Sequence, residues 1–288
     1  MSLLSPQLEA FLEIVRAGTV HGAAEAIGIT QTGVTQRLRA LEKQLSVTLF
    51  IRSRRGMGLT GEGDALYRYC QAALELEGQA MAQITGSAGK RAVQVHIVGP
   101  TSLMSSRIVP QCRPVMARFP NLLMRFQVAD EPNRIDYLRS GQAQFAVLTP
   151  EQVAREMHSK RLEPERYVLV GAPAWRGRSL NDILTTERLI DFDPSDQTSL
   201  SYLKTFDLYR SDSGSERHFV NNNDALIHLF HAGAGFGVLM QEIAAPHLAR
   251  GDIILLNDGA VFESEAVLAW YPRPRMTEYF QALVRAII

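Results

Sequence analysis

Three short helical patterns open the chain. Apolar residues recur every three or four positions from Leu8 to Val15, behind a Ser5-Pro6 pair that is typical of a capped helix start. A second, shorter pattern runs from Thr19 to Ile27, and Gly28 permits an abrupt turn before a third begins at Thr30. A short helix, a glycine turn and a longer helix together predict a helix-turn-helix.

The third helix has two different faces. Its apolar stripe, which we expect to be buried, consists of Val34, Leu38, Leu41 and Leu45. Its outer face carries hydroxyls, amides and cations, namely Gln31, Thr32, Thr35, Gln36, Arg39 and Lys43, with Glu42 as the only acid. This composition favours contact with phosphates and base edges, whereas an ordinary solvated surface helix, the alternative interpretation, more often mixes Glu and Lys.

The segment after the third helix predicts a small two-stranded wing. Residues 49–60 place apolar positions on both sides of a glycine-rich tip that carries Arg52, Arg54 and Arg55. Arginines at such a tip are well placed for backbone phosphates or a minor groove, and the alternative is a solvated basic hairpin.

A long helix is predicted from Thr60 to about Ile84. Its apolar residues form a heptad-like seam of Leu66, Tyr69, Ala73, Leu76 and Ala80. Because a single seam needs a partner, we expect the chain to dimerise through this helix and to pair two third helices for two half-sites. Residues 86–91 are small and polar, as in a hinge.

From Ala92 the pattern changes to short apolar runs that alternate with helical spacing. The runs cover residues 93–98, 122–128, 145–148, 167–170, 189–192, 236–240 and 267–270, and a closing helix starts at Thr277. This alternation predicts βαβ units with parallel strands and helices on both faces. The last run and the closing helix are expected to return to the sheet of the first runs.

The predicted fold class is α/β overall. We expect a winged helix-turn-helix in residues 1–60, a linker helix and hinge in 61–91, and a two-subdomain α/β domain in 92–288. Subdomain I comprises about 92–162 and 267–288, and subdomain II about 163–266.

Charge is informative only through its distribution. The 288 residues have a formal net charge of +0, but residues 37–55 hold six cations against one acid, a local balance of 6 − 1 = +5. Two cysteines in such a chain argue against a disulfide-stapled secreted fold. The start of the sequence lacks the pattern of a signal peptide, and no run is long enough to span a bilayer, so a cytosolic protein is expected.

Residues 6–67 resemble the DNA-binding domain of the LysR-type transcriptional regulators. The matching features are Ala23-Ala24, Thr30-Gln31 with Val34 and Thr35, Leu41-Glu42, Leu49-Phe50 followed by Arg52, and Leu59-Thr60-x-x-Gly63. The sequence departs from the family pattern at His21-Gly22, at Gly33 and at Ser46. The resemblance implies that DNA contacts fall on Gln31, Thr32, Thr35, Gln36, Arg39, Arg52 and Arg54.

A small-molecule site is expected where the predicted strands end. Ligands of open α/β sheets bind beyond the carboxyl ends of the strands. The candidate residues are Thr101, Ser102, Asp130, Glu131, Thr149, Asp193, Ser195 and Asn222, and Asp196 ends the same loop as Asp193. Acids in converging loops indicate a ligand with a cationic end, whereas hydroxyls at a helix start favour an anionic end. Each acid could alternatively be a solvated cap or turn residue.

Residues 92–288 resemble the effector domain of the same family, whose two subdomains are of the periplasmic-binding-protein type. Within the family the chain is most similar to regulators that sense lysine and arginine and control basic amino-acid export. The similarity rests on Ile29-Thr30-Gln31, Val34-x-Gln36-Arg37, Val128-x-Asp130-Glu131, Phe192-Asp193-x-x-Asp196, Val220-Asn221 with Ala225, and Trp270. It implies double-stranded DNA, a small effector and further copies of the chain as partners, with a tetramer and RNA polymerase contact as extensions.

The sequence lacks the patterns that other functions require. The sequence shows no Walker loop, no dinucleotide fingerprint and no nucleophile with a partner set, so neither an enzyme nor a cofactor is expected. His228 and His231 are spaced like a metal pair but lack a third ligand, and no metal site is predicted. A redox sensor would require Cys70 and Cys112 to meet, and a transport protein would require an export signal. An effector that is another small carboxylate stays open.

Overall fold

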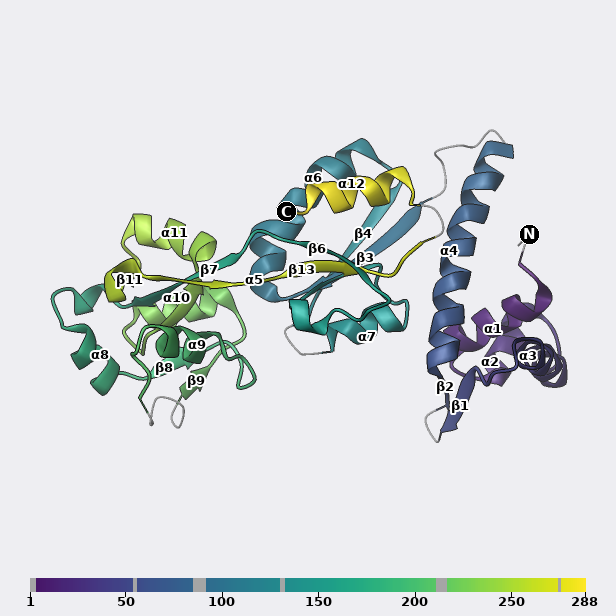
Figure 1. Cartoon of the computed structure of the whole chain (residues 1–288), viewed down its shortest axis with the longest axis horizontal. Helices are drawn as coiled ribbons and strands as arrows, with labels where there is room; N and C mark the ends of the chain where they lie inside the picture. Colours follow the sequence, from purple (N-terminus) through teal and green to yellow (C-terminus); the bar gives the residue numbers. More distant parts are fainter. Residues whose placement is uncertain (1–3, 54–55, 85–91, 130–132, 211–216, 274–275) are drawn as a thin grey trace.

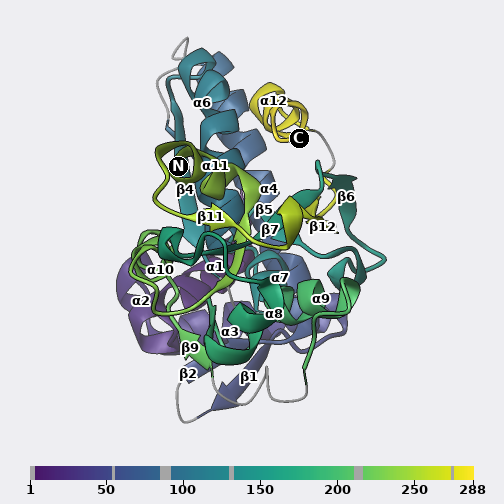
Figure 2. The ribbon, with the colours of Figure 1, turned by 90° about the vertical axis from the view of Figure 1, so that its left-hand side faces the viewer.

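The computed structural model describes residues 4–53, 56–84, 92–129, 133–210, 217–273 and 276–288. Three bodies follow one another along the long axis of the molecule (Figure 1): a small helical body at the N-terminus with the long helix α4 beside it, then two α/β subdomains. The second view (Figure 2) places the far subdomain in front of the N-terminal body. The predicted fold class is confirmed, while the domain boundaries drawn from the sequence stay predictions.

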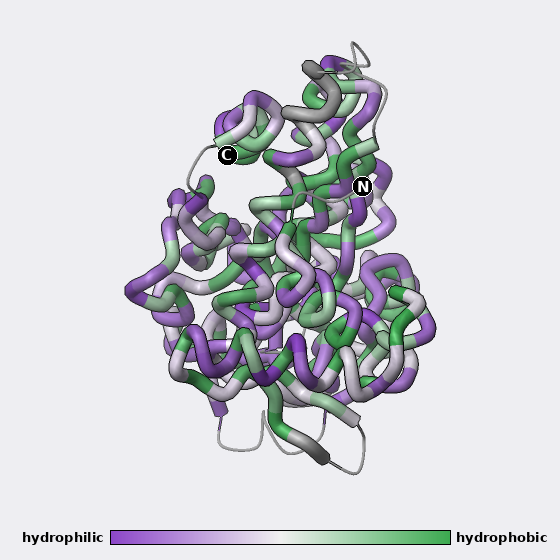
Figure 3. Tube along the Cα trace, turned by 90° about the vertical axis from the view of Figure 1, so that its right-hand side faces the viewer, coloured by the Kyte–Doolittle hydropathy of each residue, from purple (hydrophilic) through white to green (hydrophobic). Residues whose placement is uncertain are grey.

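The N-terminal body contains three helices, α1 (Pro6–Ala17), α2 (Val20–Ile27) and α3 (Gln31–Leu45). The hydroxyl groups of Ser5, Thr19 and Thr30 each accept a backbone N–H of the first helical turn, as the sequence predicts. The adjacent alanines of α2 are buried, which lets α3 pack closely on α1 and α2. Seen from this end, hydrophilic and hydrophobic residues are interspersed along the trace (Figure 3).

The apolar stripe of α3 is buried except at its last position. Val34, Leu38 and Leu41 are buried, but Leu45 is 42% exposed, so its predicted burial is wrong. Leu45 is the final residue of the helix, and Ser46 adopts a left-handed conformation with φ 57°. The chain therefore turns away before the helix completes another turn against the core.

The wing is confirmed as a two-stranded antiparallel ribbon of β1 (Phe50–Ser53) and β2 (Gly56–Leu59). The helix α4 (Gly61–Ile84) starts directly against it. A Cβ atom at Gly63 would lie 2.2 Å from the backbone oxygen of Leu49, so only glycine permits this approach. The wing and α4 are therefore fixed to each other through backbone contact.

Two faces of α4 have different neighbours. Cys70 is buried in the N-terminal core, and Leu66, Tyr67 and Leu74 pack against that core. In the predicted seam Tyr69 is 57% exposed, as an unpaired dimerisation face would be, while the side chain of Ala80 lies outside the described residues. Dimerisation through α4 stays a prediction.

The same helix also contacts subdomain I. The Arg68 guanidinium lies 3.9 Å from the centroid of the Tyr271 ring and donates a hydrogen bond to the backbone oxygen of Arg139. A Cβ atom at Gly141 would lie 3.0 Å from the ring of Tyr67. One face of α4 therefore touches the N-terminal core and another touches subdomain I.

Subdomain I is built on a five-stranded sheet with the order β4-β3-β5-β13-β6. Its strands are β3 (Val93–Gly99), β4 (Leu122–Val128), β5 (Phe145–Leu148), β6 (His158–Arg161) and β13 (Val267–Trp270). The strand β3 runs parallel to β4 and β5, whereas β13 runs antiparallel to β5 and β6. The chain therefore does return to the first sheet at β13, as predicted.

Helices cover both faces of this sheet. One long helical segment consists of α5 (Thr101–Leu103), a π-helical turn η1 (Met104–Ile108) and α6 (Val109–Arg118). It packs with α12 (Glu278–Ala286) over one face. The helix α7 (Arg134–Arg139) covers the other face, followed later by the short helix η2 (Pro150–Gln152).

Subdomain II is organised around β7 (Glu165–Gly171), the strand that leaves subdomain I. It pairs with β10 (Gly237–Met240), β11 (Ile254–Leu255) and β12 (Val261–Ser264), and β8 (Leu189–Asp191) pairs with β9 (Arg217–Phe219). The remaining helical elements are η3 (Pro173–Trp175), α8 (Leu180–Thr186), α9 (Thr198–Thr205), α10 (Asn223–His231), α11 (Gln241–Arg250) and η4 (Asn257–Gly259).

The prediction of parallel strands is wrong for β7, as it is for β13 in subdomain I. All three partners of β7 run antiparallel to it, although β8 and β9 are parallel to each other. The reason is that β7 carries the chain out of subdomain I and β12 carries it back, so the two must run in opposite directions. Figure 1 shows this pair of crossing strands between the two subdomains.

Candidate functional sites

The outer face of α3 is open to solvent. Thr32, Gln36 and Arg39 are exposed, and Thr35 is half-buried. The one acid of this face, Glu42, accepts the backbone N–H of Leu49 at 2.8 Å and so is turned toward the wing. The structure therefore leaves hydroxyls, amides and cations on a projecting helix, the groups that bind phosphates and base edges.

Among the remaining arginines of the predicted basic patch, the side chain of Arg37 is described, whereas those of the wing arginines are not. Arg37 lies 3.7 Å from Glu9 of α1, which offsets its charge. Arg52 is opposite Met57 in the wing, but its side chain and the whole of Arg54 lie outside the described residues. Gln31, at the start of α3, is exposed and hydrogen-bonded to His21 of α2.

A cavity of about 400 Å³ lies between the two subdomains. Its lining comes from both of them and from the crossing strands, and its polar residues are Ser102, Arg134, Thr149, Glu165, Tyr167, Asp193, Ser195, Asp196, Gln197, Thr198, Ser199, Asn223 and Ser264. The volume suits a ligand of the size of an amino acid. A cleft of this kind is where open α/β sheets bind ligands.

Four of the sequence-predicted residues line this cavity: Ser102, Thr149, Asp193 and Ser195. Thr101 and Asn222 are not in its lining. The Asn222 side chain instead accepts the backbone N–H of Ala225 at 3.0 Å and caps α10, which leaves the next residue, Asn223, to face the cavity. Asp130 and Glu131 lie outside the described residues.

Glu165 is the residue that sequence reasoning missed. It is buried at the start of β7, and the Tyr167 hydroxyl donates a hydrogen bond to its carboxylate. Burial raises the pKa of Glu165 above its usual 4.5, against the opposing effects of the Tyr167 hydroxyl, Arg107 and Arg134. No strand-end signal marks it, because it opens a strand rather than closing one.

The acids of the loop after β8 are held by local hydrogen bonds. The Asp193 carboxylate accepts the backbone N–H of Ser195 at 2.8 Å and its hydroxyl at 2.6 Å, and these bonds lower the pKa of Asp193. Asp196 accepts the N–H of Thr198 at 2.8 Å. Asp191, the last residue of β8, is buried and forms an ion pair with Arg217 at 2.6 Å. The loop therefore presents two ordered carboxylates, Asp193 and Asp196, to the cavity.

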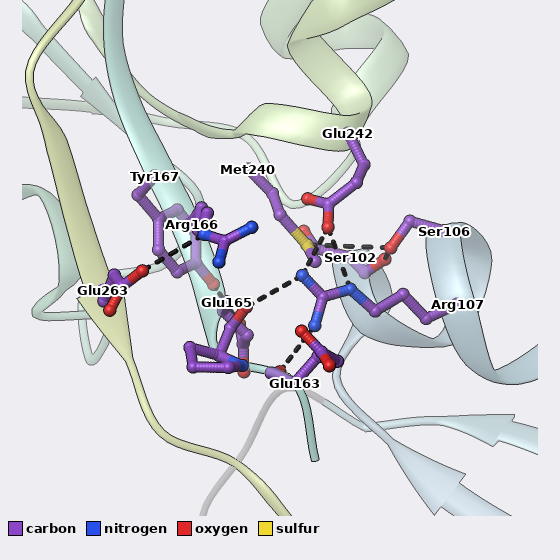
Figure 4. Close-up of polar contacts among 11 residues, drawn as sticks. Ser102, Ser106, Arg107, Glu163, Glu165, Arg166, Tyr167, Met240, Glu242 and Glu263 are labelled. Atoms are coloured by element: carbon purple, nitrogen blue, oxygen red, sulfur yellow. Dashed lines mark hydrogen bonds and ion pairs between the residues drawn. The ribbon is translucent and has the colours of Figure 1, made fainter. Parts of the chain in front are cut away.

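A buried arginine joins the subdomains beside the cavity (Figure 4). Arg107, on the π-helical turn of subdomain I, donates to the backbone oxygens of Glu163 and Pro164 at 2.6 and 2.9 Å and to the carboxylate of Glu242 on α11. We call this set the Arg107 clamp. Nearby, the Ser106 hydroxyl contacts the Met240 sulfur at 3.6 Å, a further contact across the cleft.

The two cysteines do not form a redox pair. Cys70 is buried in the N-terminal core and Cys112 in the core of subdomain I, and both are free. Burial raises the pKa of the Cys70 thiol to about 11 and that of Cys112 to about 12. Both therefore stay protonated and unreactive near neutral pH.

Comparison with known proteins assigns the family. The profile described as the bacterial regulatory helix-turn-helix protein of the lysR family matches residues 6–64, and the LysR substrate binding domain matches residues 88–288. The chain belongs to the LysR family. It is a transcriptional regulator with a DNA-binding helix-turn-helix and an effector-binding domain, and not an enzyme.

Several LysR-type proteins resemble it over most of their length. The regulator PtxR of Pseudomonas aeruginosa is 26% identical, with 98% of this chain and 89% of PtxR covered. LysG of Mycobacterium bovis is 26% identical over 88% of this chain and 83% of LysG. A structure of full-length LysG from Corynebacterium glutamicum, with the effector Arg bound, has a TM-score of 0.82 at 21% identity, covering 99% and 96% of the two chains.

Among the described residues, no helix is both long and apolar enough to cross a membrane. In the same part of the chain, His, Cys, Asp and Glu side chains do not gather in threes as a metal site would need. His231, one of the two histidines with metal-like spacing, has its ring Nδ1 2.7 Å from the backbone oxygen of Asp252.

Proposed function

We propose that this LysR-type regulator senses a basic amino acid, lysine or arginine, in the cavity between its subdomains. The observation that carries the proposal is the charge of the lining: among the residues that the structure describes, it holds the carboxylates Glu165, Asp193 and Asp196 and one guanidinium, Arg134. An excess of carboxylates favours a ligand with a cationic end. The buried Glu165 is the preferred partner for that end, because its charge is costly to hold in the empty cleft.

The other end of an amino acid also has partners in the cavity. Arg134, Ser102 and Thr149 belong to subdomain I and offer a guanidinium and two hydroxyls for an α-carboxylate. The Ser102 hydroxyl lies 3.5 Å from the amide oxygen of Asn223 in subdomain II. The arginine-bound LysG of C. glutamicum supports this proposal through its shared fold.

Ligand binding would act on DNA through a shift between arrangements of the oligomer. A ligand that contacts both subdomains favours the arrangement in which they are held together. We propose dimerisation through α4, a tetramer built from two such dimers, and RNA polymerase as a partner. Contacts with double-stranded DNA are assigned to Gln31, Thr32, Thr35, Gln36 and Arg39, with Arg52 and Arg54 from the wing.

Isothermal titration of the full chain tests the ligand. Arginine and lysine are expected to bind, whereas citrulline and norleucine, which keep the shape but lack the charge, bind at least about 30-fold more weakly. Glu165→Gln is expected to remove this preference. The matched control is Glu263→Gln, at an exposed acid on β12 that pairs with Arg166 at 3.1 Å.

Three outcomes would contradict the proposal. Equal binding of arginine and citrulline would show that charge does not select the ligand. Binding of benzoate or another aromatic acid, with no response to any amino acid, would move the chain to a different effector class. An unchanged preference in Glu165→Gln would place the cationic end elsewhere.

A further inference from the structure

The helices α2 and α3 are joined by a hydrogen bond at the surface assigned to DNA. His21 occupies the first turn of α2 and Gln31 is the first residue of α3. The side-chain nitrogen Nε2 of Gln31 lies 3.0 Å from Nδ1 of His21. Both side chains are exposed, so the bond is not a by-product of core packing.

The chemistry of the two groups fixes the direction of this bond. The Gln31 amide nitrogen donates, so the tautomer of His21 that fits this contact accepts through Nδ1 and carries its proton on Nε2. That second ring nitrogen lies 3.5 Å from a carboxylate oxygen of Glu25, one turn further along α2. His21 therefore lies between Gln31 on one ring nitrogen and Glu25 on the other.

An amide held in one orientation presents its hydrogen-bond donor and acceptor to a base in one fixed order. Gln31 has two N–H groups and one carbonyl oxygen, so donating one N–H to His21 leaves the other N–H and the oxygen free. This pair matches adenine in the major groove, where N7 accepts and the N6 amino group donates. Without His21 the amide can rotate by half a turn, which exchanges its donor and acceptor.

We propose that His21 is a positioning residue for DNA reading: it holds the Gln31 amide in one orientation and thereby sets base preference at one position of each half-site. The proposal rests on the assignment of Gln31 to base contact. His21 itself makes no base contact in this scheme, and its effect is on selectivity rather than on affinity for DNA in general.

The test is selection of sequences from a duplex library with a randomised centre, by the full-length protein and its variants. Gln31→Ala first identifies the position at which base preference depends on Gln31. His21→Ala is expected to lower the preference for adenine at that same position by about tenfold, while total binding to the library changes much less. The double variant should show the same base preference at that position as Gln31→Ala alone.

Two variants separate positioning from a structural role. His21→Asn places an amide oxygen near the position of Nδ1 and is expected to restore the preference. His218→Ala, at an exposed histidine on β9 in subdomain II, is the matched control and should leave the base preference unchanged.

The outcomes distinguish this proposal from the one on which it rests. If Gln31→Ala changes the selected base and His21→Ala does not, the positioning role is wrong and the reading role of Gln31 stands. If neither changes it, Gln31 does not read a base. A uniform loss of affinity in His21→Ala, with a smaller dependence on salt, would mean that His21 contacts phosphate instead.

Discussion

The outer face of α3 and the cleft between the subdomains are both polar sites, but they are assembled in opposite ways. The face of α3 comes from one continuous helix, and its side chains project from a backbone that the core behind it holds in place. The cleft takes residues from segments as far apart as Ser102 and Ser264, and a hydrogen bond from Ser102 to Asn223 crosses it. A site of the first kind should respond to substitutions one residue at a time, whereas a site of the second kind should respond as a unit.

The largest effect is expected at the Arg107 clamp. Arg107→Met leaves two backbone oxygens and a carboxylate without their donor, and we expect it to lower the free energy of unfolding by about 3 kcal/mol. Urea unfolding of the full chain measures this. Arg166→Met is the control, because its pair with Glu263 is exposed and worth less than about 1 kcal/mol. Equal losses in both variants would show that the clamp adds no more stability than an exposed ion pair.

The pH dependence of ligand binding comes next in size. Burial raises the pKa of Glu165 above 4.5, so at mildly acidic pH part of the empty protein carries a neutral Glu165. A cationic ligand needs the charged form, so its affinity should fall as pH drops through the raised pKa, by up to about tenfold per pH unit. The same shift makes the empty protein less stable as pH rises from 4.5 through that raised pKa.

Calorimetry of arginine binding at several pH values tests this sign. The wild-type protein should release a proton on binding below the raised pKa of Glu165, and Glu165→Gln should lose most of this dependence. Asp196 lines the same cavity, and Asp196→Asn serves as the comparison. Affinity that rises as pH falls would contradict a cationic ligand at Glu165.

At the surface of α3 the expected effects are smaller and separable. Gln36→Ala should relax base choice at one position by about 1–3 kcal/mol of discrimination and leave other positions unchanged. Competition among duplexes that differ at single positions measures this. A loss spread over every position would mean that Gln36 supports the helix rather than reading DNA.

Arg39→Ala should give the smallest and least specific change. Arg39 is an exposed cation, so its removal should weaken binding to all duplexes by a similar factor and reduce the slope of log affinity against log salt by about 1. Lys43→Ala, one turn further along α3, is the matched comparison for a cation nearer the helix end. A change confined to one sequence would assign Arg39 to base contact.

The difference between the two sites also explains what the sequence could predict. The helices of the N-terminal body follow from local signals, such as the caps at Ser5, Thr19 and Thr30, and the strands β4, β5 and β13 begin and end where their apolar runs do. The short polar strands β6 and β9 carry no such signal, because their residues are specified by their neighbours in the sheet.

The cleft shows where local reasoning ends. Ser102, Thr149, Asp193 and Ser195 were predicted because each follows a strand. Glu165 is instead the first residue of a strand, and it reaches the cavity only because β7 crosses between the subdomains, a path that no local pattern records. The antiparallel direction of β7 and the exposure of Leu45 were mispredicted for the same reason: both depend on where the chain goes next.

The two contacts of α4 connect subdomain I to the N-terminal body. Cys70 anchors the helix in the N-terminal body, while Arg68 stacks on Tyr271, which directly follows the last strand of subdomain I. Arg68 lies five residues after Gly63, where α4 meets the wing, so the contact with subdomain I and the contact with the wing share the first half of the helix. A rotation of subdomain I that keeps the Arg68–Tyr271 contact would therefore be passed to the wing over a short length of helix.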